Sequence, residues 1–178
     1  MKRSIFVLVV LAFGFVSSAN AEKGDQYWML KAGLSFIDNS DSPDAIQSLN
    51  ITYGYGITKA IAAEVDYQHS LGGGGYDNTD TNQKGEYSFN LMSIGAAYRH
   101  VFYEQLYARG KIAFAFGNDE RTIEGTDAKT GEPSGVAGSL ALGVLAGNVV
   151  GSSLTLELEY LKQPGDLSSI LLGANVTF

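Results

Sequence analysis

Apolar and polar residues alternate one by one along most of the chain beyond residue 26. In the clearest segment, residues 48–57, every second position is Leu, Ile or Tyr, and Ser, Asn, Thr or Gly fill the positions between. Successive side chains of a β-strand point to opposite faces, whereas an amphipathic helix repeats its apolar positions every three or four residues. The alternation therefore predicts β-strands, each with one apolar and one polar face.

Eight segments carry this alternation, and the connections between them differ in length. The segments are residues 28–36, 48–57, 63–71, 87–98, 106–116, 136–144, 154–160 and 169–178. The short connections are Thr58–Lys59, His100–Tyr103 and Gly147–Asn148, and the long ones are Asp38–Ile46, Gly72–Lys84, Gly117–Ser134 and Lys162–Asp166. Short turns at one end and long loops at the other are typical of outer-membrane barrels. The sequence thus predicts an all-β fold, an eight-stranded antiparallel up-and-down transmembrane β-barrel with both chain ends at the periplasmic end.

The fourth segment breaks the alternation. Tyr87, Phe89 and Leu91 have the opposite parity to the apolar series that runs from Met92 to Tyr98. Two explanations stay open: a β-bulge near Leu91, or an upper half of the strand that projects beyond the membrane.

The polar face separates a membrane barrel from a soluble one. A soluble barrel would carry Lys and Glu on every outward face, but the polar face of the second, fourth, sixth and eighth segments is mostly Ser, Thr, Asn, Gly and Ala. Such residues suit a crowded interior, so we expect the apolar face to contact lipid. Hydrocarbon offers no hydrogen bonds to an open sheet edge, which requires the barrel to close. The residues expected to form aromatic girdles at the two interfaces are Tyr27, Trp28, Tyr53, Tyr55, Tyr98, Tyr160 and Phe178.

The first 21 residues read as a cleaved signal peptide. Lys2 and Arg3 precede an apolar run from Ile5 to Phe15, and Ala19–Ala21 forms an A-x-A cleavage site. The mature domain would then span residues 22–178, exported to the outer membrane of a Gram-negative bacterium.

The composition of the chain excludes several classes of function and structure. The mature chain keeps ten basic and nineteen acidic residues, a formal charge of −9, which argues against nucleic acid as a partner. The chain has no Cys, so a disulfide framework and a thiolate metal site are excluded. The mean hydropathy of +0.01 is too low for a bundle of membrane helices.

The chain resembles the small outer-membrane β-barrel superfamily typified by OmpX and the OmpA transmembrane domain, often called the porin family. The resemblance covers the mature chain and is most specific at residues 172–178, with a second match at residues 106–112. It implies that the alternate apolar residues before the terminal aromatic are the signal for the barrel assembly machinery. In this sequence those residues are Leu172, Ala174, Val176 and Phe178. The scaffold hosts adhesins, stabilising proteins, narrow channels and lipid-modifying enzymes, so the fold does not name the function.

Charged residues on the polar face all fall on the odd-numbered segments. They are Lys31, Glu64, Asp66, Arg109, Lys111, Glu157 and Glu159. These segments run in the same direction, which places their mid-points at similar depth, and we predict an ion-pair network that fills the lumen. The alternative is a proton or ion path gated by Arg109 and Glu64.

Enzymatic activity is not expected. His69 and Ser70 are adjacent on a strand and should point to opposite faces, and His100 falls in a predicted periplasmic turn. The glycine run Gly72–Gly75 lacks the residues of a phosphate loop and is interpreted as a flexible surface loop. No cofactor or metal site is predicted. The long loops are acidic, which suits solvated loops or, alternatively, divalent-cation bridging to lipopolysaccharide phosphates.

We therefore expect a monomeric outer-membrane protein with a structural or surface-interaction role. Its partners would be outer-membrane lipid and lipopolysaccharide, the barrel assembly machinery during insertion, and a surface partner bound through the loops, above all through Gly117–Ser134. A narrow channel for small or hydrophobic solutes is the alternative, and a lipid A-modifying enzyme is the third.

Overall fold

The structure is a computed structural model that describes residues 24–37, 45–78, 83–103, 105–123, 128–149 and 152–177. The predicted signal peptide and Phe178 lie outside the described residues. Among the described residues, no helix is long and apolar enough to cross a membrane.

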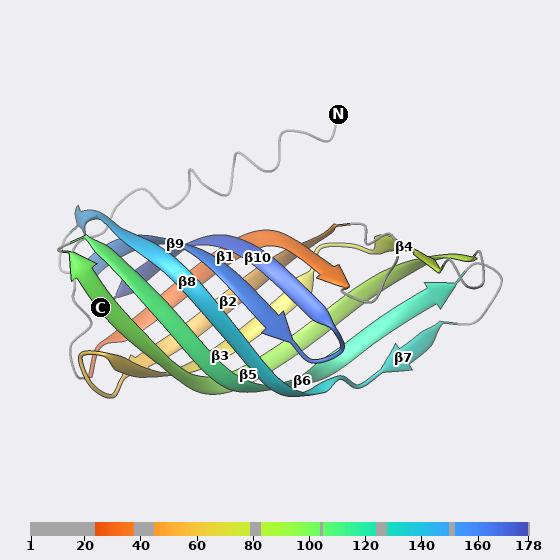
Figure 1. The fold of residues 1–178 in the computed structure, drawn as a ribbon, viewed down its shortest axis with the longest axis horizontal. Helices are drawn as coiled ribbons and strands as arrows, with labels where there is room; N and C mark the ends of the chain where they lie inside the picture. The colour runs from red at the N-terminus through yellow and green to blue at the C-terminus, as the bar shows by residue number, and fades with distance from the viewer. Residues whose placement is uncertain are drawn as a thin grey trace.

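The described residues form ten β-strands. They are β1 (Gln26–Ile37), β2 (Ile46–Gly56), β3 (Ile61–Ser70), β4 (Gly74–Asn78), β5 (Gln83–Tyr103), β6 (Leu106–Ile123), β7 (Lys129–Gly131), β8 (Ser134–Val149), β9 (Ser152–Gln163) and β10 (Leu167–Thr177). Eight of them pair in the ring order β1-β2-β3-β5-β6-β8-β9-β10, every pair is antiparallel, and β10 pairs back onto β1 from Tyr27↔Thr177 to Ile37↔Leu167 (Figure 1). The predicted closed eight-stranded antiparallel barrel is confirmed.

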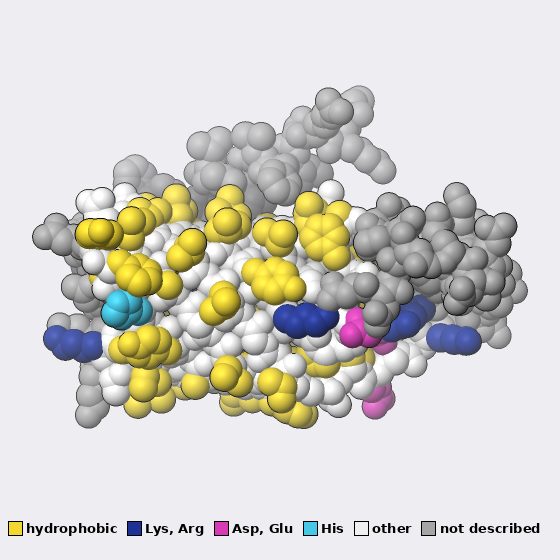
Figure 2. Space-filling model, viewed as in Figure 1, with side chains coloured by type: hydrophobic (Ala, Val, Ile, Leu, Met, Phe, Trp, Pro, Cys, Tyr) yellow, Lys and Arg dark blue, Asp and Glu magenta, His cyan; other side chains and the backbone are white. Residues whose placement is uncertain are grey.

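The two faces of the barrel follow the predicted alternation. In β2 the side chain of Thr52 is fully enclosed in the lumen, whereas its neighbours Ile51 and Tyr55 are exposed on the outer face. Apolar side chains are exposed on the outer face of all eight barrel strands, and Figure 2 shows many of them spread over one side. Because a strand exposes alternate residues, each strand supplies both the lumen and this outer surface.

One end of the barrel carries an extension, of which the sequence indicated only the upper half of the fourth segment. Strands β5 and β6 stay paired to Gly85↔Ile123, well past the last pair between β3 and β5 at His69↔Asn90. Short strands β4 and β7 flank them, so a four-stranded sheet projects beyond the rim (Figure 1). We call residues 74–78, 85–90, 118–123 and 129–131 the extension, and its end of the barrel the outer end.

The extension corrects the prediction of two long loops. The interval Gly117–Ser134 continues β6 as far as Ile123 and contributes β7. In Gly72–Lys84, residues 74–78 form β4, so Gly72–Gly75 is not wholly a loop as expected. A Cβ atom at Gly74 would lie 2.2 Å from Ile46, which shows how closely β4 packs on the barrel mouth.

The fourth predicted segment contains no bulge. Its pairing with β6 runs without a register shift from Gly85 to Val101, so the bulge near Leu91, the first of the two explanations left open, is wrong. The upper half of β5 does continue past its last pair with β3, as the second explanation requires. Tyr87, Phe89 and Leu91 instead point into the outer mouth of the lumen, where all three are buried.

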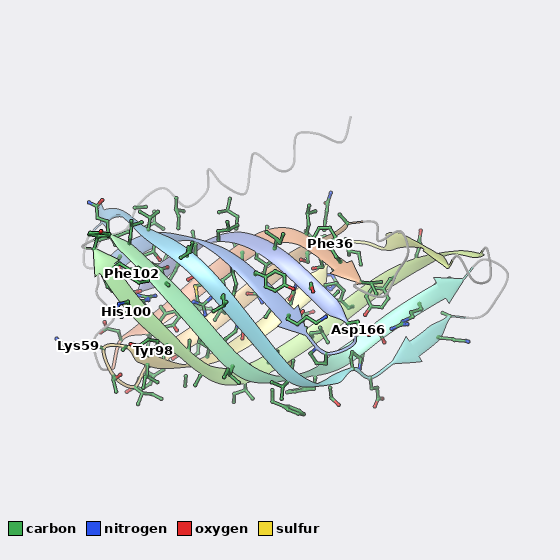
Figure 3. The ribbon with its side chains drawn as sticks, in the orientation of Figure 1. Phe36, Lys59, Tyr98, His100, Phe102 and Asp166 are labelled. Carbon is green, nitrogen blue, oxygen red and sulfur yellow. The ribbon has the colours of Figure 1, made fainter. Side chains whose placement is uncertain are left out.

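The opposite end, the inner end, carries the short turns. Figure 3 places Lys59, Tyr98, His100 and Phe102 there. Two predicted turns are strand instead: His100–Tyr103 continues β5, and Gly147–Asn148 belongs to β8 beside a register shift. In both cases the backbone hydrogen bonds of the hairpin persist closer to the turn than the side-chain pattern indicated.

Candidate functional site in the barrel lumen

The seven charged residues of the predicted network come from alternate strands of the ring. Strand β1 supplies Lys31, β3 supplies Glu64 and Asp66, β6 supplies Arg109 and Lys111, and β9 supplies Glu157 and Glu159. All seven side chains lie inside the barrel and are at most 4 % exposed. The structure therefore places them together, as the parity of their strands requires.

Glycines on the intervening strands make room for these long side chains. Glu64 lies in register between Gly54 and Gly95, and Glu157 lies between Gly143 and Gly173. A Cβ atom added at Gly173 would lie 2.4 Å from the Lys31 side chain. Large and minimal side chains therefore alternate around the barrel, which lets the charged groups meet near its axis.

Arg109 occupies the centre of the network. Its Nε donates to Glu157 at 3.0 Å, Nη1 donates to both oxygens of Glu64 at 2.8 and 3.0 Å, and Nη2 donates to Glu157 at 2.6 Å and to Glu159 at 3.1 Å. A guanidinium group has five N–H donors, so these five hydrogen bonds account for all of them. One side chain thus links the two walls formed by β3 and β9.

Two lysines complete the pairing. Lys31 donates to Glu159 and lies 3.6 Å from Glu157. Lys111 donates to Asp66 at 2.7 Å and lies 3.7 Å from Glu64. Each carboxylate therefore contacts at least one cation, which is what makes burial of these charges tolerable.

Neutral side chains that the sequence reasoning left out of the network bind the same carboxylates. Tyr27 donates to Glu64 at 2.6 Å, Tyr107 donates to Glu157 at 3.2 Å, and Ser93 donates to Asp66 at 2.7 Å. Tyr27 is only 2 % exposed, so its prediction as a girdle residue is wrong. The sequence did contain the information needed to place Tyr27. It is an odd-numbered residue of the same strand as Lys31, so the two side chains point to the same, inward face.

A further cation sits below the network at the inner end. Arg99 on β5 lies over the Tyr107 ring, 4.5 Å from its centroid. The seven network residues carry three positive and four negative charges. Arg99 therefore brings the charges inside this half of the barrel into balance.

Above the network the lumen is closed by two further layers. Gln68 Nε2 donates to the hydroxyls of Ser169 at 2.9 Å and Ser35 at 3.2 Å, and Ser48 adjoins them. The outermost layer is apolar, and we call it the stopper. Its members are Ile46, Tyr87, Phe89, Leu91 and Leu167, each at most 2 % exposed, with Ile37 packed against them.

The residues of the predicted assembly signal lie on the other face of the barrel. Leu172, Ala174 and Val176 have the outward parity of β10, and Leu172 is 61 % exposed. Their role as an assembly signal stays a prediction, as does that of Phe178, which lies outside the described residues.

The structure separates the one Ser–His pair considered for catalysis. Ser70 is enclosed in the lumen and hydrogen-bonds the backbone of Phe89, whereas His69 on the other face contacts Asn90 at 2.5 Å through Nδ1. Their predicted orientation toward opposite faces is confirmed. Within the described ranges, no group of three or more His, Cys, Asp and Glu side chains is arranged to hold a metal ion.

Comparison with known proteins shows a similarity of fold alone. No protein-family model matches the chain, and no curated protein sequence matches it. Among solved structures, Ail, the attachment invasion locus protein of Yersinia pestis, superposes with a TM-score of 0.59 at 14 % identity, covering 88 % of this chain and 99 % of that one. OprG, an outer membrane protein of Pseudomonas aeruginosa, gives 0.57 at 12 % identity over 90 % and 99 % of the chains. Neisserial surface protein A gives 0.57 at 12 % identity over 88 % and 96 %. The fold implied by the sequence resemblance is thereby confirmed.

Proposed function

We propose that this chain is an integral outer-membrane protein that anchors its extension at the cell surface and does not conduct solutes. The outer face of β6 supports the membrane location. Its outward residues from Leu106 to Phe116 include no polar side chain, and the next outward residues are Asn118 and Glu120. Eleven strand residues at the tilt of a barrel span about 25 Å, which matches the apolar band of outer-membrane barrels.

The single observation that carries the non-conducting role is the five-fold coordination of Arg109 across the lumen. A solute would have to displace a guanidinium held by Glu64, Glu157 and Glu159 and then pass the apolar stopper. Removing one partner from a buried ion pair costs about 3–5 kcal/mol, so displacing Arg109 from its carboxylates is strongly unfavourable. This favours a filled barrel over the narrow channel that the sequence left as an alternative.

Planar-bilayer recording tests the non-conducting role. The folded protein should give no steady unit currents in 1 M KCl, because no continuous water path crosses the barrel. Steady, sizeable unit currents from the unmodified protein would contradict the proposal. The double variant Phe89→Ala/Arg109→Ala, which removes side chains from both barriers, serves as the positive control for a barrel that has been opened.

The extension supports a role in surface contact. It stands beyond the apolar belt by about 15–20 Å, judged from six strand pairs, and its two outermost strands, β4 and β7, are the ends of the described sheet order. Unpaired strand edges can accept a strand from a partner. The sequence segments that contain it, 72–90 and 117–134, carry five more acidic than basic residues. We therefore propose a partner with a basic surface.

Ail offers a contrast, since it was solved with sucrose octasulfate, a heparin analogue and thus a polyanion. An acidic extension should repel such a ligand. Proteoliposomes of this protein should adhere to polylysine-coated surfaces at physiological salt and not to heparin-coated ones. The variant Glu86→Lys/Glu120→Lys/Glu132→Lys should reverse the preference, and Glu→Gln at the same positions should weaken both. Equal adhesion to both surfaces by the unmodified protein would contradict the proposed partner.

A further inference from the structure

The two ends of the lumen are closed in different ways. At the outer end the stopper presents only apolar side chains to the interior, apart from the Tyr87 hydroxyl. At the inner end a cavity of about 20 Å³ is lined by Tyr27, Ala62, Ala97, Arg99 and Arg109, among others. A cavity of this size holds one water molecule. The inner end therefore has room for a water molecule beside polar groups, whereas the stopper at the outer end is a packed apolar layer.

Small residues on three neighbouring strands create the inner cavity. Gly56 on β2 lies in register with Ala62 on β3, and Ala62 lies in register with Ala97 on β5. All three point inward, so no side chain fills the space beside Arg109. The next residues on the same strands, Ala63 and Ala96, are also in register with each other but face outward.

Three buried polar atoms without a hydrogen-bond partner lie near the same end. Both side-chain heteroatoms of Asn175 and the hydroxyl of Thr177 are enclosed and have no hydrogen-bond partner. Asn175 is in register with Met29 and Thr155. It lies two residues along β10 from Gly173, which is in register with Lys31 and Glu157 of the network. Among the described residues, three more such atoms lie on the outer side of Arg109: Gln68 Oε1, Ser139 Oγ and Gln163 Oε1, of which Gln163 is in register with Leu167 of the stopper. A buried amide that lacks partners destabilises the fold, and an internal water molecule that bonds it recovers this loss.

We propose that water enters the lumen from the inner end only. It binds at Asn175 and Thr177 and reaches the Arg109 guanidinium through the cavity between Ala62 and Ala97. The stopper keeps this water from the outer medium. In the orientation proposed above, the ion-pair network exchanges water and protons with the periplasm and is insulated from the cell exterior. This inference rests on the proposed function in one respect: the orientation proposed there identifies the inner end with the periplasm and the outer end with the cell exterior.

Nuclear magnetic resonance of the protein in lipid nanodiscs tests the proposal. Cross-peaks with water should appear at the side-chain amide of Asn175 and at the Arg109 Nε–H, and should be absent at the methyl groups of Ile46, Leu91 and Leu167. Water signals at the stopper methyls, or their absence at both Asn175 and Arg109, would overturn it.

Substitution then identifies the route. Ala62→Leu or Ala97→Leu fills the inner cavity and should slow deuterium exchange of the Arg109 Nε–H at least tenfold. The outward-facing changes Ala63→Leu and Ala96→Leu serve as matched controls and should leave the exchange rate unchanged. In the Ala97→Leu background, Leu91→Ala should restore fast exchange by opening the outer end.

Exchange that is insensitive to both inward substitutions would also overturn the proposal. If neither inward variant folds, the contrast between Arg109 and the stopper methyls in the unmodified protein decides the question. The outcomes remain separable from the conductance test. A barrel that carries no current but shows no internal water at its inner end refutes the one-sided water entry and leaves the proposed function intact.

Discussion

The ion-pair network and the stopper fill the same barrel by opposite means. The network joins seven charged side chains from four strands, with Arg109 at its centre, and each contact depends on the position of a specific partner. The stopper packs Ile46, Phe89, Leu91 and their neighbours with little directional bonding. Charges removed from water need their partners, whereas apolar groups need only to be covered. The lumen therefore combines two kinds of stabilisation. Loss of one charged partner leaves another charge uncompensated, whereas loss of one apolar side chain removes only its own packing.

The largest effect is expected from removing the centre of the network. Arg109→Met leaves Glu64, Glu157 and Glu159 with an uncompensated charge, so the free energy of unfolding should fall by about 4 kcal/mol. Urea titration of the protein folded in lipid vesicles measures it. Arg99→Met is the matched control: it removes a cation that stacks on Tyr107, which is worth about 0.5–1 kcal/mol. Equal losses of unfolding free energy for the two variants would show that Arg109 in the network is no more important for stability than Arg99 at the inner end.

A smaller and more local effect is expected in the stopper. Leu91→Ala opens a cavity in an enclosed apolar layer and should cost about 3 kcal/mol. Its neighbour Met92, which is 43 % exposed on the outer face, provides the control Met92→Ala. The same urea titration should show a clearly smaller loss for the control. If Met92→Ala were as costly as Leu91→Ala, the stopper would not be a packed layer.

The smallest effect concerns a single hydroxyl. Tyr27→Phe removes the hydrogen bond to Glu64, a carboxylate that keeps its bonds to Arg109. A hydrogen bond to a charged group contributes about 1.5–3 kcal/mol, and we expect a loss near the lower limit. Tyr53→Phe, whose hydroxyl donates to Gln26 on the exposed face, should change the unfolding free energy by less than about 0.5 kcal/mol. If Tyr27→Phe left the unfolding free energy unchanged, the Tyr27 hydroxyl would contribute nothing to the stability of the network.

The strands of the extension could not be predicted from the alternation of apolar and polar residues. Residues 117–123 carry Gly, Asn, Asp, Glu and Arg, a composition typical of a surface loop. They nevertheless form strand, because the β5–β6 hairpin continues its backbone ladder from Leu91↔Gly117 to Gly85↔Ile123 and gains β4 and β7 at its edges. Backbone pairing is independent of side-chain polarity, so the alternation of apolar residues could not reveal it.

The sequence alone determined the number of barrel strands, which face of each strand points inward, and the seven charged residues of the network, because side-chain parity follows from the geometry of a strand. It left open which carboxylate meets which cation, that Tyr27 joins them, and that Tyr87, Phe89 and Leu91 turn inward to close the outer mouth. Those contacts join residues as far apart as Lys31 and Glu159. Only the closing of the ring, with its particular register between strands, brings them within reach of each other.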